Sequence, residues 1–186
     1  MACVSSLLSF VPMRRLLRPT LAALVVLLPA RTAMAQAADT AATRRAVMAV
    51  VDSALMYINV GNMIGLSDMM TPEGQVYAAR EAAGTGGAFT MRTAAAQRVT
   101  GTRAPIIERG FNPTIHIAGT IASVWLPYDL WAQGKWSHCG IDHFTLVKVG
   151  TAWRVANLTY TIEQPPACRM HPDGVPKGFT APPSSL

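Results

Sequence analysis

Residues 137–149 read Ser-His-Cys-Gly-Ile-Asp-His-Phe-Thr-Leu-Val-Lys-Val. The run is rich in β-branched and aromatic residues, which favours an extended strand. Side chains alternate between the two faces of a strand, so Asp142 shares a face with His138 and Phe144. Cys139 and His143 lie on the opposite face. The stretch therefore predicts a strand that carries a carboxyl group and an imidazole on one side.

Similar runs flank this strand. Residues 114–130 and 152–162 are rich in Ile, Val, Thr, Trp and Tyr, and a shorter apolar pair stands at Ile106-Ile107. Gly134-Lys135 and Gly150-Thr151 supply turns between the last three runs, which predicts consecutive antiparallel pairing. The second half of the chain is therefore expected to form a β meander.

The first half of the chain has helical patterns. Residues 39–58 repeat apolar side chains at spacings of three and four, which predicts an amphipathic helix. Shorter helices are expected at residues 63–70 and 93–99, with a weak strand at 74–79 and a turn at 84–87. Helices followed by a meander predict an α+β fold in which a curved antiparallel sheet wraps the helices.

Residues 1–35 have the order of an export signal. Three arginines precede an apolar run, and small residues two apart follow it: Arg14, Arg15, Arg18, residues 21–28 and Ala33-Met34-Ala35. The apolar run is shorter than the roughly 20 residues that span a bilayer. The alternatives are a retained membrane anchor and a start at Met13. We expect cleavage near Ala35, export to the periplasm or the medium without membrane attachment, a domain at residues 36–168, and a loose tail rich in Pro and Gly at 169–186.

The net charge changes once this leader is removed. The whole sequence has 16 Lys and Arg against 10 Asp and Glu, a net charge of +6. The leader holds four arginines and no acid, so 16 minus 4 leaves 12 basic residues and a net charge of +2. A charge so close to zero gives no reason to expect nucleic acid as a partner.

The same cut removes Cys3 and leaves only Cys139 and Cys168. In an oxidising compartment this pair predicts one disulfide. The alternative is two buried free thiols.

Several motifs, in this order of elements, carry a resemblance to a known family: Gly119-Thr120-Ile121-Ala122-Ser123-Val124-Trp125, Tyr128-Asp129-Leu130, Gly134-Lys135, residues 137–144 and Trp153-Arg154-Val155. Residues 42–168 resemble the nuclear transport factor 2-like superfamily, and more narrowly its exported bacterial lumazine-binding-like or SnoaL-like members. The resemblance implies a cone of three helices packed in a strongly curved antiparallel sheet, with a pocket at the open end and a homodimer formed through the outer sheet face. This superfamily contains isomerases, dehydratases, cyclases and binding proteins, so the fold does not choose an activity.

One motif can be compared residue by residue. Ile141-Asp142-His143-Phe144 matches the strand of bacterial ketosteroid isomerases that carries the oxyanion-hole aspartic acid. The resemblance implies that Asp142 is a protonated hydrogen-bond donor in an apolar site. Ala54 stands where that enzyme has its tyrosine, the base falls near Ala78, and only a change of register brings in Glu81. Steroid isomerisation is therefore not expected.

The candidate acid and base groups are Asp142, His138 and His116. Taken as one strand, residues 114–130 place His116 on the same face as Val124. Burial can shift the pKa values of such groups towards the range where they exchange protons. The alternative is that Asp142 and His138 satisfy each other or the backbone in a packed core.

Other side chains are expected around the pocket or on the outer sheet face. Trp125 and Trp131 are expected on the outer face at a dimer contact, with a core position as the alternative. No histidine pair has helical ligand spacing and no phosphate-binding glycine motif is present, so neither a metal nor a cofactor is expected. The predicted pocket residues are Tyr128, Phe144, Leu158 and Tyr160.

Three functions follow from these patterns. We expect an exported domain that holds a small, largely apolar molecule in the cone. The alternative is an isomerase, dehydratase or cyclase that uses Asp142 as acid and His138 or His116 as base. A third function is a dimer that only makes protein contacts and whose cone is filled by its own side chains.

Overall fold

The computed structural model describes residues 28–82 and 86–180, and the chain divides into two compact units at Asp39 and Thr40. Helix α1 (Leu28–Asn59) contains the described part of the first unit and the start of the second. The predicted export signal falls mostly on residues 1–27, outside the described residues, and stays a prediction. Among the described residues, no helix is both long and apolar enough to cross a membrane.

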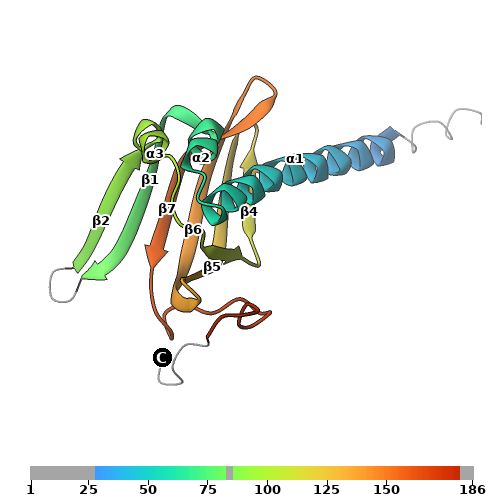
Figure 1. Cartoon of the computed structure of the whole chain (residues 1–186). Coiled ribbons are helices and arrows are strands. Elements are labelled where there is room, and N and C mark those ends of the chain that lie inside the picture. The colour runs from blue at the N-terminus through green and yellow to red at the C-terminus, as the bar shows by residue number, and fades with distance from the viewer. Residues whose placement is uncertain (1–27, 83–85, 181–186) are drawn as a thin grey trace, which may run out of the picture. The chain divides into compact units, whose positions relative to one another are not determined.

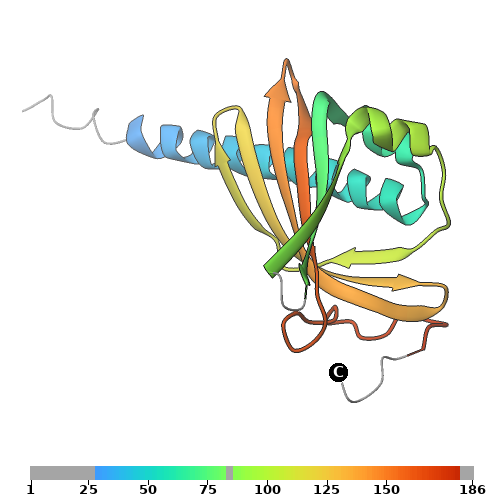
Figure 2. The same cartoon turned by 90° about the vertical axis from the view of Figure 1, so that its left-hand side faces the viewer.

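The second unit is built on a seven-stranded mixed sheet that bends without closing (Figures 1 and 2). Its strands are β1 (Met70–Ala82), β2 (Gly86–Thr93), β3 (Ile107–Gly110), β4 (Thr114–Ala118), β5 (Ile121–Ala132), β6 (Lys135–Val149) and β7 (Ala152–Ile162). The order is β2-β1-β7-β6-β5-β3, and β4 also pairs with β5. The predicted meander is confirmed for β5, β6 and β7, whereas β1 and β7 pair in parallel.

Three helical segments lie along one face of this sheet (Figure 2). They are the part of α1 after Asp39, α2 (Met63–Met69) and α3 (Ala94–Thr100). The Asn62 side chain accepts a hydrogen bond from the Gly65 amide at 2.9 Å, and Thr93 accepts one from the Ala96 amide at 3.1 Å. These side chains cap the first turns of α2 and α3, where backbone N–H groups have no helical partner.

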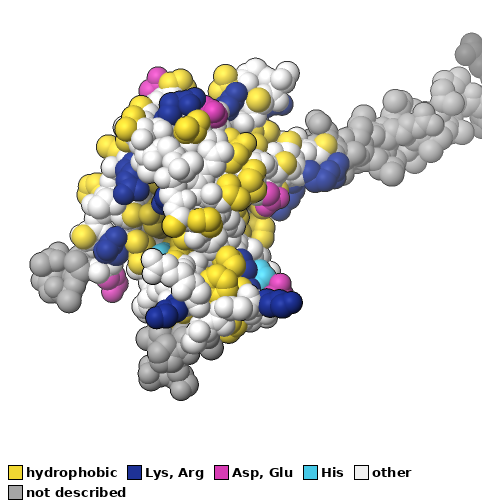
Figure 3. Space-filling model, viewed as in Figure 1, with side chains coloured by type: hydrophobic (Ala, Val, Ile, Leu, Met, Phe, Trp, Pro, Cys, Tyr) yellow, Lys and Arg dark blue, Asp and Glu magenta, His cyan; other side chains and the backbone are white. Residues whose placement is uncertain are grey.

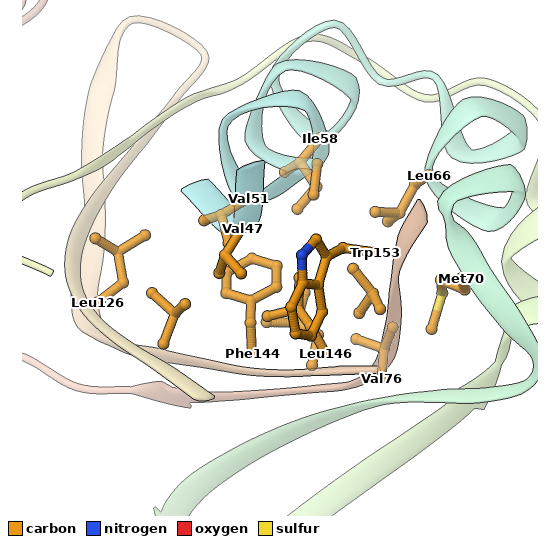
Figure 4. Packing of buried hydrophobic residues seen from close by; sticks show 14 of the residues in the cluster. Val47, Val51, Ile58, Leu66, Met70, Val76, Leu126, Phe144, Leu146 and Trp153 are labelled. Carbon is orange, nitrogen blue, oxygen red and sulfur yellow. The ribbon is translucent and has the colours of Figure 1, made fainter. Parts of the chain in front are cut away.

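The core lies between α1 and the concave face of the sheet. Val47, Val51 and Ala54 are fully buried, as the spacing of apolar residues along the helix predicts. They pack with Phe144 and Leu146 from β6, which are also fully buried (Figure 4). The helix is therefore held by one apolar face, and the sheet supplies the other half of the core.

The run of residues 114–130 is two strands rather than one. Gly119 has a φ of +59°, a backbone conformation that residues with a side chain rarely adopt. The turn at Gly119 lets β4 fold back and pair antiparallel with β5. Ile115 and Ile117 pack against the core. The intervening His116 is exposed, so the turn reverses the facing that a single strand would have given.

The disulfide between Cys139 and Cys168 is present, with the two Cα atoms 5.7 Å apart. This confirms the pairing expected from the two cysteines. Next to it, Cys139 and Glu163 exchange backbone hydrogen bonds of 2.9 and 3.2 Å. The chain is thus tied back to β6 directly after β7 ends.

Residues 169–180, the described part of the predicted tail, make several contacts with the sheet. Asp129 is fully buried and accepts hydrogen bonds from the His171 amide at 3.0 Å and from Arg109 at 2.5 and 2.9 Å. Arg109 also donates to the Gly174 carbonyl at 2.7 Å. Trp131 donates to Asp129 and packs edge-on against Phe179 from the tail. Trp131 is fully buried, in agreement with the core position given as its alternative.

We expect Asp129→Ala to lower the free energy of unfolding by about 3 kcal/mol, because it leaves the Arg109 charge and a buried amide without their acceptor. Urea unfolding of the oxidised protein measures this loss. Asp52→Ala removes an exposed carboxylate from α1 and should change stability by less than about 0.5 kcal/mol. Equal effects of the two substitutions would contradict the role assigned to Asp129.

Candidate functional site

A cavity of about 400 Å³ lies on the concave side of the sheet. Its volume is in the range of small-molecule pockets, so the alternative of a cone filled by its own side chains does not apply. Figure 3 shows hydrophobic side chains in the hollow of this face and basic side chains near its edge. The lining residues are Ile58, Leu66, Val76, Ala78, Arg80, Thr90, Arg92, Gln97, Arg103, Ile106, Glu108, Leu130, His138, Asp142, Leu158 and Tyr160.

Two carboxyl groups meet in this cavity. Glu108 on β3 and Asp142 on β6 are hydrogen-bonded through their side chains, and only 8% and 2% of these residues are exposed. Burial raises the pKa of Glu108 to about 7, although the Asp142 hydrogen bond and the Arg103 charge act in the opposite direction. Burial, and then the charge of Glu108, raise the pKa of Asp142 well above its ordinary value. The two carboxyl groups therefore titrate as a pair, and the pair keeps a proton to higher pH than two separate exposed carboxyl groups would.

The end of α1 positions Glu108. The Asn59 side chain accepts a hydrogen bond from the Glu108 amide at 2.6 Å and donates one to the Glu108 carbonyl at 3.0 Å. The Ile106 amide donates to the Asn59 carbonyl at 3.0 Å. The Asn59 side chain thus makes the two backbone hydrogen bonds that a neighbouring strand would make with Glu108. These bonds fix the point from which the Glu108 side chain enters the cavity.

Sequence reasoning missed Glu108. Its signal was a single acidic residue directly after Ile106-Ile107, inside an apolar run too short to show an alternating pattern. The four-residue strand β3 is recognisable only through its pairing with β5, where Glu108 faces Leu130.

His138 lines the same cavity, as predicted from the strand alternation. Burial, and then the charge of Arg80, lower its pKa, so the imidazole is neutral at pH 7. Its Nδ1 lies 2.9 Å from the Ser137 hydroxyl, and its ring packs edge-on against Tyr128. A neutral imidazole and a pair of carboxyl groups with raised pKa values therefore face one pocket.

The other predicted site residues divide into three groups. Leu158 and Tyr160 line the cavity, and burial raises the pKa of the Tyr160 hydroxyl. Tyr128 and Phe144 do not line it, because Phe144 is part of the core and Tyr128 donates its hydroxyl hydrogen to the Thr161 carbonyl at 2.6 Å. The expectation for His116 is wrong: the β4–β5 turn places it opposite Ser123 and in solvent, away from Asp142.

Three buried polar atoms in the described part of the chain have no hydrogen-bond partner. They are Gln97 Oε1, His138 Nε2 and Asp142 Oδ2, and all three residues line the cavity. A buried polar atom without a partner costs about 1–3 kcal/mol. The concentration of this cost in one cavity is typical of a site that is completed by a bound molecule.

The lining also contains three arginines, so the cavity is less apolar than expected. The described residues contain no group of three or more His, Cys, Asp or Glu side chains that could hold a metal ion.

Comparison with solved structures gives the fold. An NTF2-like protein with a cystatin-like fold from Novosphingobium aromaticivorans superposes with a TM-score of 0.55 at 12% identity, over 70% of this chain and 88% of that one. An NTF2-like protein of unknown function from Silicibacter pomeroyi gives 0.50 at 16% identity, over 67% and 98%. A protein of unknown function from Mycobacterium tuberculosis gives 0.53 at 16% identity, over 70% and 78%.

No family model matches the sequence, and no curated protein matches it either. The likeness to solved structures confirms the nuclear transport factor 2-like fold that the sequence motifs implied.

The raised pKa of Glu108 predicts a pH-dependent stability. Between its ordinary value of 4.5 and about 7, the folded chain keeps a proton that the unfolded chain has released. The free energy of unfolding contributed by Glu108 therefore falls as the pH rises through this window. In Glu108→Gln this contribution is absent, so the stability of the wild type relative to the variant should fall as the pH rises from 4.5 to 7.

Urea unfolding of both proteins across this range measures the difference. The lowered pKa of His138 makes the contribution of His138 to the free energy of unfolding rise with pH below its ordinary pKa. His138 is present in both proteins, so this contribution does not distinguish them. Glu73→Gln, at an exposed position outside the cavity, is the matched control for the substitution itself. A difference between the wild type and Glu108→Gln that stays constant across this pH range would contradict the assigned pKa.

Proposed function

We propose that the cavity binds a small organic molecule through the polar groups that lack partners. The supporting observation is that Gln97 Oε1, His138 Nε2 and Asp142 Oδ2 are all buried, all unpaired and all on residues that line one cavity of about 400 Å³. Apolar side chains such as Leu66 and Leu158 line the rest and would contact the body of the ligand.

The carboxyl pair sets what the ligand must offer. Asp142 Oδ2 accepts a hydrogen bond from a ligand hydroxyl when it carries no proton, and donates to a ligand carbonyl when it does. The side-chain hydrogen bond to Glu108 couples the two carboxyl groups, so the pair can exchange a proton with the ligand. A ligand with an oxygen function attached to an apolar body fits this requirement.

A second candidate function is acid–base catalysis of the isomerase, dehydratase or cyclase kind. It is favoured by the opposite pKa shifts of His138 and of the Glu108–Asp142 pair within one pocket. His138 Nε2 would accept a proton from the ligand, and the carboxyl pair would return one to a ligand oxygen or carbon, so protons balance without another reagent. His116 has no part in this scheme.

Export and self-association belong to the same proposal. The disulfide supports an oxidising compartment, in agreement with the leader-like residues 1–35. For a homodimer, the outer sheet face offers Trp125, which is 50% exposed and packs against His143.

Blocking the cavity at its rim tests ligand binding. Thr90 is exposed on β2 and lines the cavity, so Thr90→Trp should remove binding of phenylacetamide and phenylpyruvate without disturbing the core. Thr114→Trp adds the same bulk at an exposed position of β4 outside the cavity and should leave binding unchanged. Isothermal titration calorimetry gives the affinities. Retained binding in Thr90→Trp would place the ligand elsewhere and overturn the proposal.

Hydrogen–deuterium exchange separates binding from catalysis. If the pocket acts as an acid–base site, the wild type should accelerate the exchange of the CH₂ protons next to the ketone of phenylpyruvate in D₂O. The loss of their proton NMR signal measures this exchange. Asp142→Asn and His138→Gln should each slow this exchange about a hundredfold or more, because each removes a proton-transfer group. No acceleration by the wild type, with the probe bound, would remove the enzymatic candidate and leave the binding function.

A further inference from the structure

Three arginines reach the cavity from three separate segments. Arg80 lies on β1, Arg92 on β2 and Arg103 in the loop between α3 and β3. All three residues are exposed, so they stand at the rim rather than in the core. The sequence patterns did not predict arginines at the cavity, and the proposed role of the carboxyl pair does not require them.

Two of the arginines are set by the β1–β2 hairpin. Arg92 faces Val76 in the register, two residues from the pair formed by Thr90 and Ala78, and all four residues line the cavity. Arg80 follows Ala78 on the same face of β1. The hairpin thus carries two guanidinium groups along one wall.

The third arginine starts from an anchored backbone on another wall. The Arg103 amide donates to the Gly61 carbonyl at 3.0 Å. A Cβ atom on Gly61 would lie 2.0 Å from the Arg103 carbonyl oxygen, so the end of α1 and this loop touch backbone to backbone. The close approach requires glycine, and it fixes the point from which the Arg103 side chain extends.

None of the three arginines has an acidic partner among the described residues. The ion pairs there join Arg98 to Asp68, Arg109 to Asp129 and His171 to Asp173. The lining sets three arginines against two buried carboxyl groups, Glu108 and Asp142, whose pKa values are raised by burial. The rim of the cavity is therefore electropositive.

We propose that the cavity selects an organic oxyanion, a carboxylate or a phosphate monoester with an apolar body, whose charged end is held by Arg80, Arg92 and Arg103. Guanidinium groups bind both oxyanions through paired charge-assisted hydrogen bonds. The apolar lining beneath the rim, with Leu66, Leu130 and Leu158, excludes a bare inorganic ion as the best ligand because it requires an apolar body. This inference rests on the proposed binding function and names its ligand class.

Calorimetry with matched probes tests the inference on the full-length oxidised protein. The probes are phenylacetate, phenylacetamide, phenyl phosphate and inorganic phosphate. We expect phenylacetate or phenyl phosphate to bind about tenfold or more tightly than phenylacetamide, and inorganic phosphate to bind more weakly than either organic anion. Which organic anion binds better decides between a carboxylate and a phosphate ligand. Added salt should weaken the binding of the anionic probes and leave the binding of phenylacetamide unchanged.

Substitutions assign the selectivity to the rim. Arg80→Gln, Arg92→Gln and Arg103→Gln should each weaken binding of the preferred anion about fivefold to tenfold, with little effect on phenylacetamide. Arg45→Gln, on the exposed side of α1 and outside the cavity, should have no effect.

Equal affinity for phenylacetate, phenyl phosphate and phenylacetamide, or loss in Arg45→Gln equal to that in the rim variants, would overturn the inference. If Thr90→Trp still abolishes binding in that case, the binding function stands and only the ligand class is wrong. Failure of all four probes to bind at millimolar concentration would count against both.

Discussion

Two hydrogen bonds of the Asn59 side chain join the end of helix α1 to strand β3, which carries Glu108 into the cavity. Asn59, the last residue of α1, bonds to both the amide and the carbonyl of Glu108 and so joins the helix to the short strand β3. The helix is itself fixed by the apolar core, and β3 is fixed by β5. These anchors set the position of the helix end beside the sheet, and the cavity is lined there by Ile58 and Glu108. The buried carboxyl pair then follows, since β3 can present Glu108 to Asp142 in only one register.

The strand alternation around Asp142 was predictable because a strand has an exact period of two. Asp142, His138 and Phe144 all lie on the concave side, and the facing of Cys139 allows its disulfide. The same argument failed for His116, since it assumed one strand where Gly119 starts a turn. A parity argument holds only within an unbroken strand, and the two-residue turn at positions 119–120 reverses it here.

Other features could not be predicted because they depend on contacts distant in the sequence. Glu108 meets Asp142 across 34 positions, counted as 142 minus 108, and no local pattern links them. Asp129 draws the tail onto the sheet through the amide of His171, a group present in every residue except proline. The arginines are ordinary exposed residues in the sequence, and only the cavity that they share gives them a common role. The predicted concave face therefore suggested a largely apolar ligand, whereas the assembled pocket is apolar below and cationic at its rim.

The parallel pairing of β1 with β7 has a consequence for how the chain reaches this state. The hairpin of β1 and β2 is attached to the rest of the sheet only through β7, whose partner positions come about 80 residues later. The wall that carries Arg80 and Arg92 cannot dock until almost the whole chain has left the ribosome. A sheet that must wait for its last strand is completed late in folding, and until then the edge of β1 that pairs with β7 has no partner strand.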